Sequence, residues 1–553
     1  MKKDQKKQDI NNKRNINFFS AILVVMGSSI GAGIFFKSKS VLDNSQNSLI
    51  LAIFCWIIAA FSVIAMALAL IEISSARNDN LSLLGWTKVF NGRTTFKASK
   101  NFMFYIYLPL TFFYMPLYFI NSLQDGIGAL IHNNQSIIEN KSVIPFTFNT
   151  NCDWFIWSII GFLIFTYFFF FAGISSKVGN IQNKIVTYIK FFPLAFVAIM
   201  GFVLVGMNAG GWNDVSIGVQ KPIGDLADLA AGGSLSSFFP GLGMFLAISA
   251  IFFAYDGFYV AAGIQSEMEE PKKTPMAILL GLVVTTIIYL IIAISMSING
   301  GSFSNMLIYM INLMQDTGRI LFGIINIMIA IGVLGIINGY AMWTSRFTED
   351  LIKEGELPFS IKYKDKLNEH KPKIGTFYFY VIGTFFYFIF VLIGALGYID
   401  NYGASYGVGM GRLFTFADLM STWTALFAFG FITAAIYGGI KNRKTQKVQT
   451  DQKSYFIPMA ICAVIIVGIA LIVTIIIPIL DLLLIAQVDQ SAVKANGGNY
   501  SEIIISRISV FVCLLLYIFF SYGLIFFENK YHIKKFGSIE KYEEWQKQNF
   551  NLF

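Results

Sequence analysis

The segment 27–35 lies inside a long apolar stretch near the N-terminus and has the sequence GSSIGAGIF. Each glycine costs a helix about 1 kcal/mol relative to alanine, so three glycines and two serines allow this helix to unwind. Peptide groups freed inside a membrane must be satisfied by protein, water or a ligand. Free amides beside a helix N-terminus suit a carboxylate. The alternative is close helix packing, since Gly27 and Gly31 have the GxxxG spacing.

A carboxylate stands in the middle of a second apolar stretch, 252–258, whose sequence is FFAYDGF. Asp256 is followed directly by Gly257, so a charge and a helix-weakening residue are adjacent. A charged side chain at mid-membrane is costly and usually functional; the alternative is a structural acid that is protonated or paired. Two interrupted helices in matching positions of an inverted repeat flank a substrate site near the midplane, and we expect these two stretches to do so.

Two further charged residues could take part in the same chemistry. Lys190 lies in the apolar sequence YIKFFP, and a lysine in apolar surroundings can change its charge at a reachable pH. The alternative is that Lys190 snorkels to the membrane surface. Glu72 lies at the inner end of another apolar stretch, where a structural cap or a gate partner is more plausible than a substrate ligand.

The elements that must position these residues are membrane-spanning helices. The 553 residues are 56% hydrophobic and 13% charged, whereas soluble domains are about 25% charged, so much of the outer surface must face lipid. A span needs roughly 20 apolar residues, and the chain offers about twelve such segments. The predicted spans are 17–40, 48–74, 101–130, 153–174, 180–206, 237–264, 275–299, 318–345, 374–397, 412–440, 455–480 and 503–527.

Basic residues gather in alternate connections between these spans. The basic segments are 2–14, 77–100, 353–373, 441–453 and 530–547, and the alternate connections, on the other side, are poor in positive charge and carry Lys37, Lys39, Lys141, Lys221, Arg412 and Lys494. The positive-inside rule then places both termini in the cytoplasm and makes the number of spans even. The same distribution explains the net charge of +9 without a nucleic-acid partner, because the charges do not form one soluble face.

Three motifs in this order resemble those of the amino acid–polyamine–organocation (APC) superfamily of permeases. They are GSSIGAGIF at 27–35, FFAYDGF at 252–258 running into EMEEPKKTP at 267–275, and Arg346 followed by EGELP at 354–358. The resemblance covers about residues 17–440. It departs from the family after Glu72, where SSARNDNL replaces the usual proline and paired glycines.

The resemblance implies an all-α polytopic membrane protein with about 12 transmembrane helices in a LeuT-like five-plus-five inverted repeat and two additional helices. The expected regions are a cytoplasmic N-terminal tail, a ten-helix transport core, the two additional helices and a cytoplasmic C-terminal tail, at 1–16, 17–440, 441–527 and 528–553.

The resemblance also implies roles for the interrupted segments. A substrate carboxylate would meet backbone amides around Ser29 to Gly33, and its ammonium would meet carbonyls around Phe253 to Asp256. Lys190 stands where proton-coupled members carry a lysine, so it and Glu72 are assigned to coupling or gating. The expected substrate-binding residues are Ser28, Ser29, Ile30, Gly31, Ala32, Gly33, Phe253, Ala254, Tyr255, Asp256 and Gly257.

We therefore expect a secondary transporter of the plasma membrane that moves amino acids by alternating access, with a proton or in exchange for another amino acid. The alternatives are a carrier of polyamines or another small organic cation, and a transport-inactive sensor. His132, His370 and His532 do not cluster as a zinc site would, and the chain has neither a P-loop nor a paired catalytic constellation. We expect no cofactor, no enzyme activity and no nucleic acid; the partners are the substrate, the coupled solute and the bilayer, and the oligomeric state stays open.

Overall fold

The computed structural model describes residues 17–31, 33–77, 81–210, 217, 226–259, 268–368, 371–398, 404–496 and 498–550. These residues form helices and their connections, and no β-strand occurs within these ranges. The prediction of an all-helical chain is therefore confirmed for this part of the protein.

Ten helices in the described ranges are long and apolar enough to cross a membrane. They are α4 (Leu49–Ala76), α6–η1–α7 (Arg93–Ile131), α9–η2 (Asp153–Gly173), α10 (Ser176–Gly206), α14 (Thr274–Ser297), α16 (Asp316–Lys353), α18–η6 (Lys373–Gly397), α19 (Met410–Thr445), α20–η8 (Phe456–Gln487) and α22–η9–α23 (Tyr500–Phe536).

The first and sixth predicted spans contain shorter helices. The first is divided into α2 (Phe18–Ser29) and α3 (Gly33–Asn44), and the sixth begins with α13 (Pro240–Ala254). Each predicted span thus contains at least one observed helix. The end of the sixth, 260–264, lies outside the described residues.

The outer surface of the helices is apolar. Leu163, Ile199, Phe385 and Phe526 are each about 60% exposed, at 59%, 64%, 63% and 65%. So many exposed large apolar side chains would be unfavourable in water and are stable against lipid tails. The chain is a multi-pass membrane protein.

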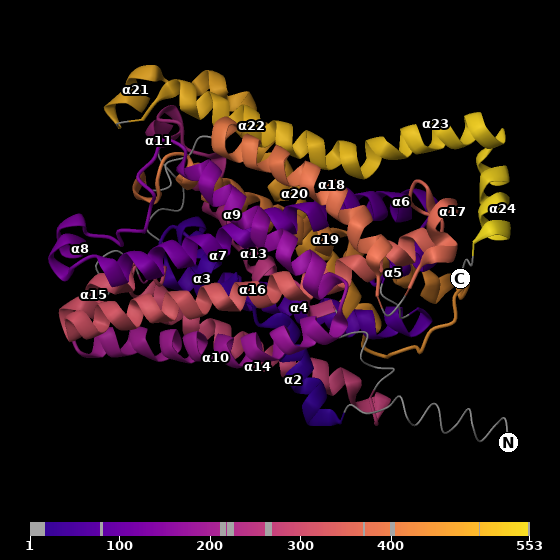
Figure 1. The fold of residues 1–553 in the computed structure, drawn as a ribbon, viewed down its shortest axis with the longest axis horizontal. Helices are drawn as coiled ribbons and strands as arrows, with labels where there is room; N and C mark the ends of the chain where they lie inside the picture. The colour runs from indigo at the N-terminus through magenta and orange to yellow at the C-terminus, as the bar shows by residue number, and fades with distance from the viewer. Residues whose placement is uncertain are drawn as a thin grey trace.

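Short helices mark two opposite faces (Figure 1). α5 (Leu83–Phe90), α17 (Ser360–Tyr363) and α24 (Ile539–Asn549) lie at one end of the long axis, which we call the terminal face. α8 (Asn134–Asn140), α15 (Met306–Met314) and α21 (Gln490–Ala495) lie at the opposite face. The basic segments 77–100, 353–373 and 530–547 contain or adjoin α5, α17 and α24, so they share one face as their charges predict.

The helices around the interrupted spans pack as two groups. α13 and α14 pack on α3 and α4, and α14 also packs on α2; we call these five helices the bundle. α16 packs on α7 and α18, which also pack on each other, and we call these three the frame. α10 contacts both α14 and α16. The candidate site lies along the seam between bundle and frame.

Candidate functional site

The two predicted interruptions are present and touch each other. α2 ends at Ser29 and α3 begins at Gly33, and Ile30 between them has extended backbone angles. α13 ends at Ala254 and is followed by a turn in which Gly257 has φ +99°, a conformation that favours glycine. A Cβ on Gly33 would lie 2.9 Å from the Cα of Ala254, so the two breaks can approach because Gly33 has no side chain.

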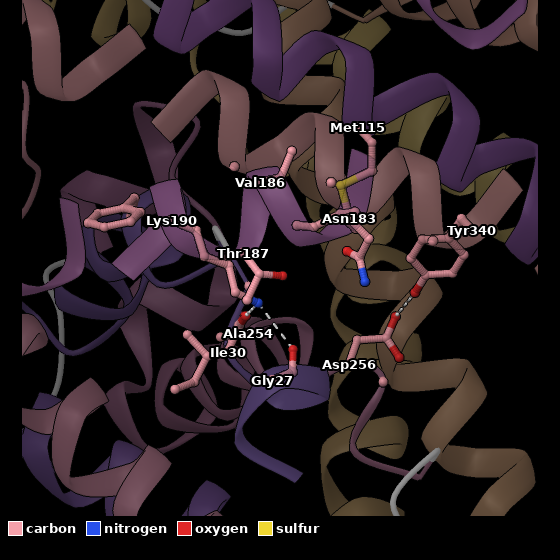
Figure 2. A pocket seen from close by; sticks show the side chains of 18 of the residues that line it. Gly27, Ile30, Met115, Asn183, Val186, Thr187, Lys190, Ala254, Asp256 and Tyr340 are labelled. Atoms are coloured by element: carbon pink, nitrogen blue, oxygen red, sulfur yellow. Dashed lines mark hydrogen bonds between the residues drawn. The ribbon is translucent and has the colours of Figure 1, made fainter. Parts of the chain in front are cut away.

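A cavity of about 470 Å³ lies between the breaks and the helices that face them. The bundle contributes Gly27, Ile30, Gly31, Gly33, Phe253, Ala254, Asp256 and Gly257 to its wall, and α10 and α16 contribute Asn183, Thr187, Lys190, Gly332, Gly339, Tyr340 and Trp343. Figure 2 shows side chains from these elements converging on one space. The cavity therefore meets the seam, where motion of the bundle would change its shape.

Lys190 reaches the break in the first span. Its Nζ donates hydrogen bonds to the carbonyl oxygens of Gly27, at 3.2 Å, and Ile30, at 3.1 Å (Figure 2). The last carbonyls of a helix have no partner within the helix, so the ammonium of Lys190 satisfies two that the interruption leaves free. Lys190 points into the protein instead of snorkelling to the surface.

Asp256 carries a carboxylate that is only half satisfied. Its Oδ2 accepts hydrogen bonds from the hydroxyls of Tyr107, at 2.7 Å, and Tyr340, at 3.2 Å, while its buried Oδ1 has no hydrogen-bond partner among the described residues. The hydroxyl of Tyr107 also lies 3.2 Å from that of Tyr259. Because buried carboxylates are normally paired, the carboxylate of this cavity-lining residue has acceptor capacity left for a cationic group.

Tyr289 of α14 joins the two breaks and was not predicted from the sequence. Its hydroxyl accepts from the amide of Gly31 at 3.2 Å and donates to the carbonyl of Ala254 at 2.9 Å. Both groups belong to the backbone predicted to hold a substrate. Their use by Tyr289 means that this hydroxyl fixes the spacing of the breaks. A lone tyrosine within an apolar helix was the available sequence signal.

The remaining predicted binding residues divide into three cases. Phe253 and Gly257 line the cavity. Tyr255 is not among the residues that line the cavity described above; its hydroxyl pairs with Thr286 of α14 at 2.9 Å. Ala32 and the side chains of Ser28 and Ser29 lie outside the described residues.

Glu72 lies away from the cavity at the end of α4. Its carboxylate accepts two hydrogen bonds from Arg443 of α19, both 2.7 Å long, and one from the amide of Lys453 at 2.8 Å. This bidentate pair is a strong, directional contact between the ends of two helices. The geometry fits a cap or gate partner.

Lys37 contradicts its prediction as a loop charge. It is 0% exposed in α3, and its Nζ donates to Asp418 Oδ1 at 2.6 Å, Ser421 Oγ at 2.8 Å and Thr422 Oγ1 at 2.9 Å on α19. Its Nζ also lies 4.9 Å from the ring centroid of Phe253, the residue that lines the cavity. We call the ion pair of Lys37 with Asp418 the Lys37–Asp418 latch. The sequence did contain a sign that Lys37 faces the interior: Gly33 and Lys37 are four residues apart and therefore share a helix face.

A membrane-embedded cavity between two interrupted helices is the arrangement found in secondary transporters. The model of the amino acid permease family matches residues 16–482 of this chain. The chain therefore belongs to the amino acid permease family, as its resemblance to the APC superfamily indicated.

The chain is also similar to individual proteins. The chain is 46% identical over 562 aligned positions to an uncharacterised protein of Mycoplasma pneumoniae, an alignment that covers 97% of this chain and 98% of that protein. It is 24% identical over 370 positions to the serine/threonine exchanger SteT of Bacillus subtilis, with 66% of this chain and 73% of SteT covered. The crystal structure of MhsT in complex with L-phenylalanine matches with a TM-score of 0.47 and 16% identity, over 82% of this chain and 97% of that one.

Proposed function

We propose that this permease moves amino acids across the plasma membrane by alternating access, with a core at 17–440 and both termini in the cytoplasm. The observation that carries the proposal is the cavity between the two interrupted spans, lined by Asp256, whose buried Oδ1 has no hydrogen-bond partner in the described part of the chain. A zwitterion needs an acceptor for its ammonium and donors for its carboxylate, and the opposed breaks offer both kinds of group.

A substrate would lie with its ammonium toward Asp256 Oδ1 and the carbonyls from Phe253 onward. Its carboxylate would face the amides between Ser29 and Gly33, near the ammonium of Lys190. Tyr289 positions the two breaks relative to each other through its bonds to Gly31 and Ala254. This bridge would lower the ordering cost of binding, because the site is held open at a fixed width.

We infer that the cavity is closed on the side of the Lys37–Asp418 latch. The latch joins α3 to α19, and the ring of Phe253 of α13 lies beside Lys37. The cavity lining extends to Ser82, the residue before α5 at the terminal face. The arrangement supports a conformer open toward the terminal face, which the positive-inside rule assigns to the cytoplasm. Transport would require the latch to separate while the terminal side closes.

The similarity to an exchanger makes exchange the first mode to test, with serine and threonine as the first substrates. Lys190 supports the alternative of proton coupling, because a lysine that loses its proton releases the carbonyls of Gly27 and Ile30. The unpaired oxygen of Asp256 is the observation that favours the second candidate function, transport of a polyamine or another small organic cation.

The test is reconstitution of the full chain in proteoliposomes. Uptake of each labelled amino acid is measured with and without unlabelled amino acid inside, and with imposed proton or sodium gradients. Internal amino acid should accelerate uptake in exchange, and an inward proton gradient should do so in symport. Uptake of spermidine but of no amino acid would establish the cation alternative, and movement of neither would contradict the proposal.

A further inference from the structure

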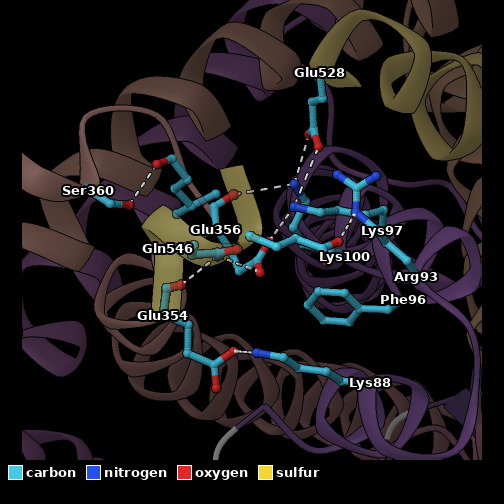
Figure 3. Close-up of polar contacts among 12 residues, drawn as sticks. Lys88, Arg93, Phe96, Lys97, Lys100, Glu354, Glu356, Ser360, Glu528 and Gln546 are labelled. Atoms are coloured by element: carbon cyan, nitrogen blue, oxygen red, sulfur yellow. Dashed lines mark hydrogen bonds and ion pairs between the residues drawn. The ribbon is translucent and has the colours of Figure 1, made fainter. Parts of the chain in front are cut away.

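The segment after α16 forms a buried ionic cluster at the terminal face (Figure 3). Glu354 pairs with Arg77 at 2.5 Å and Lys88 at 2.7 Å, and Glu356 pairs with Lys97 at 2.6 Å. Burial alone would raise the pKa of Glu356, but Lys97 and then Lys100 outweigh it and hold the pKa at about 2. Both glutamates are almost wholly buried. We call residues 354–356 the acidic arm.

The C-terminal helix α24 is docked on the acidic arm. The side-chain nitrogen of Gln546 donates to the carbonyl of Glu354 at 2.9 Å and to Glu356 Oε1 at 3.0 Å, and Gln546 is only 5% exposed (Figure 3). The ring of Phe550 lies against Gly355, where an added Cβ would come within 2.7 Å of it. Arg93 pairs with Glu543 at 3.0 Å. One polar side chain and one ring thus fix the arm from the outside.

The acidic arm lies at the terminal end of the seam. Arg77 follows α4 of the bundle, and Glu354 follows α16 of the frame, so their ion pair crosses from one group to the other. α16 also carries Gly339 and Tyr340 of the cavity wall. Any rocking of bundle against frame must change or strain the Arg77–Glu354 contact.

We propose that α24 is an intramolecular brake on the transport cycle. Held on the acidic arm by Gln546 and Phe550, it keeps bundle and frame in the arrangement of this structure and slows their relative motion. The regulation rests on the proposed transport function for its effect on flux, whereas its effect on the seam does not.

The seam is measured directly with spin labels. Phe19→Cys on α2 of the bundle and Ile361→Cys on α17 beyond the frame are exposed, at 77% and 47%. They are introduced with Cys152→Ser and Cys462→Ser, since Cys152 is exposed and Cys462 is partly so, whereas Cys55 and Cys513 are buried. Double electron–electron resonance then gives the distribution of distances across the seam in the full chain.

In that distribution, one population belongs to the arrangement of this structure and another to the moved arrangement of bundle and frame. Gln546→Ala should shift the ratio of these two populations about fivefold, because a hydrogen bond to a carbonyl and one to a carboxylate are lost. Gln548→Ala is the matched control, since Gln548 is an exposed residue of the same helix. Phe550→Ala releases the arm by its other contact and should act in the same direction. A distribution equal to that of Gln548→Ala in both variants, with or without a fall in thermal stability, overturns the brake.

Exchange in proteoliposomes gives the second readout. Gln546→Ala should raise the maximal rate severalfold with a smaller change in KM, because the substrate contacts are untouched. If the wild-type chain moves no amino acid while the seam distribution still shifts, the proposed function fails and the brake stands. If the chain transports amino acids but neither the rate nor the distribution changes, the brake fails alone.

Discussion

Ion pairs of different kinds lie beyond the two ends of the cavity. Toward the opposite face lies the latch, in which Lys37 is 0% exposed and its ammonium has its polar partners, among the described residues, on α19. At the terminal face Arg77, Lys88, Lys97 and Lys100 share the acidic arm and Glu528. A single buried pair is costly to break from one side, whereas the members of a network are coupled, so removing one changes what the others contribute. The latch should act as a switch, and the network as an adjustable restraint.

The largest effect should follow from Lys37→Met. The change leaves the carboxylate of Asp418 without its cation, and breaking a buried pair costs about 3–5 kcal/mol, with the lower end expected because Asp418 is 32% exposed. Thermal unfolding of the purified protein should show this loss, and exchange should be almost abolished. Combining Lys37→Met with Asp418→Asn should recover part of the stability. Equal damage in the single and double variants would show that the pair is not a latch.

Asp256→Asn tests the residue that lies between the two ends. The amide keeps the size of the side chain and an acceptor for Tyr107 but removes the charge offered to a substrate ammonium. Loss of a hydrogen bond to a charged group should raise KM about 10- to 100-fold. Tyr340→Phe removes the longer hydrogen bond to Asp256, at 3.2 Å, and the 2.7 Å contact with the hydroxyl of Tyr107, and should have a few-fold effect. An unchanged KM in Asp256→Asn would exclude this carboxylate from the binding site.

Lys190→Met should have a smaller effect, on the order of tenfold in transport rate, because two hydrogen bonds to carbonyls are lost. If Lys190 carries the coupled proton, the variant should also lose the pH dependence of uptake. Lys184→Met on the same helix is the control, because Lys184 is exposed and does not line the cavity. Retained pH dependence in Lys190→Met would show that this lysine does not take part in coupling. Its role would then be structural, through its hydrogen bonds to the first interrupted span.

The helices and both interruptions could be predicted because the signals are local. Apolar length specifies a span, and the glycines at 27, 31 and 33 and at 257 specify where the helix weakens. The spans agree with α4, α10, α14 and the other long helices to within a few residues at most ends. The largest errors, of eight or nine residues, are at the ends of α16 and α23 and at the start of α6, which begins at Arg93 and not near 101. Lys97 and Lys100 obscured that start, since their burial depends on Glu356 and Glu528.

The contacts that set the site were not predictable, because their partners are remote in the chain. Lys37 and Asp418 are 381 residues apart, and Gly31 and Tyr289 are 258 apart. When its partner is unknown, a lysine near the end of an apolar stretch cannot be distinguished by sequence from a loop residue. Burial of such a charge becomes favourable only when the fold supplies its counter-ion. One sequence could therefore indicate where the breaks occur but not which side chains fasten them.

The acid sensitivity of the acidic arm distinguishes the terminal network from the latch. Glu356 has an ordinary pKa of 4.5 and a folded-state pKa of about 2. A folded pKa below the unfolded value means that its contribution is complete above about pH 4.5 and is lost as the pH falls toward 2. Hydrogen-exchange protection of α24, referred to α22 in the same sample, should be constant from pH 7 to about 5 and should decline below that window.

Glu356→Gln should give at pH 7 the weaker protection that the unchanged protein shows in acid, because the amide cannot pair with Lys97 as an anion. Glu544→Gln is the control on the exposed side of α24 and should follow the unchanged protein throughout. Since Gln546 donates to Glu356 Oε1, loss of the charge loosens α24 without touching the helix itself. An equal pH profile for Glu356→Gln and Glu544→Gln would mean that the helix is held by Phe550 and its aromatic neighbours, and that the ionic network at this end does not restrain it.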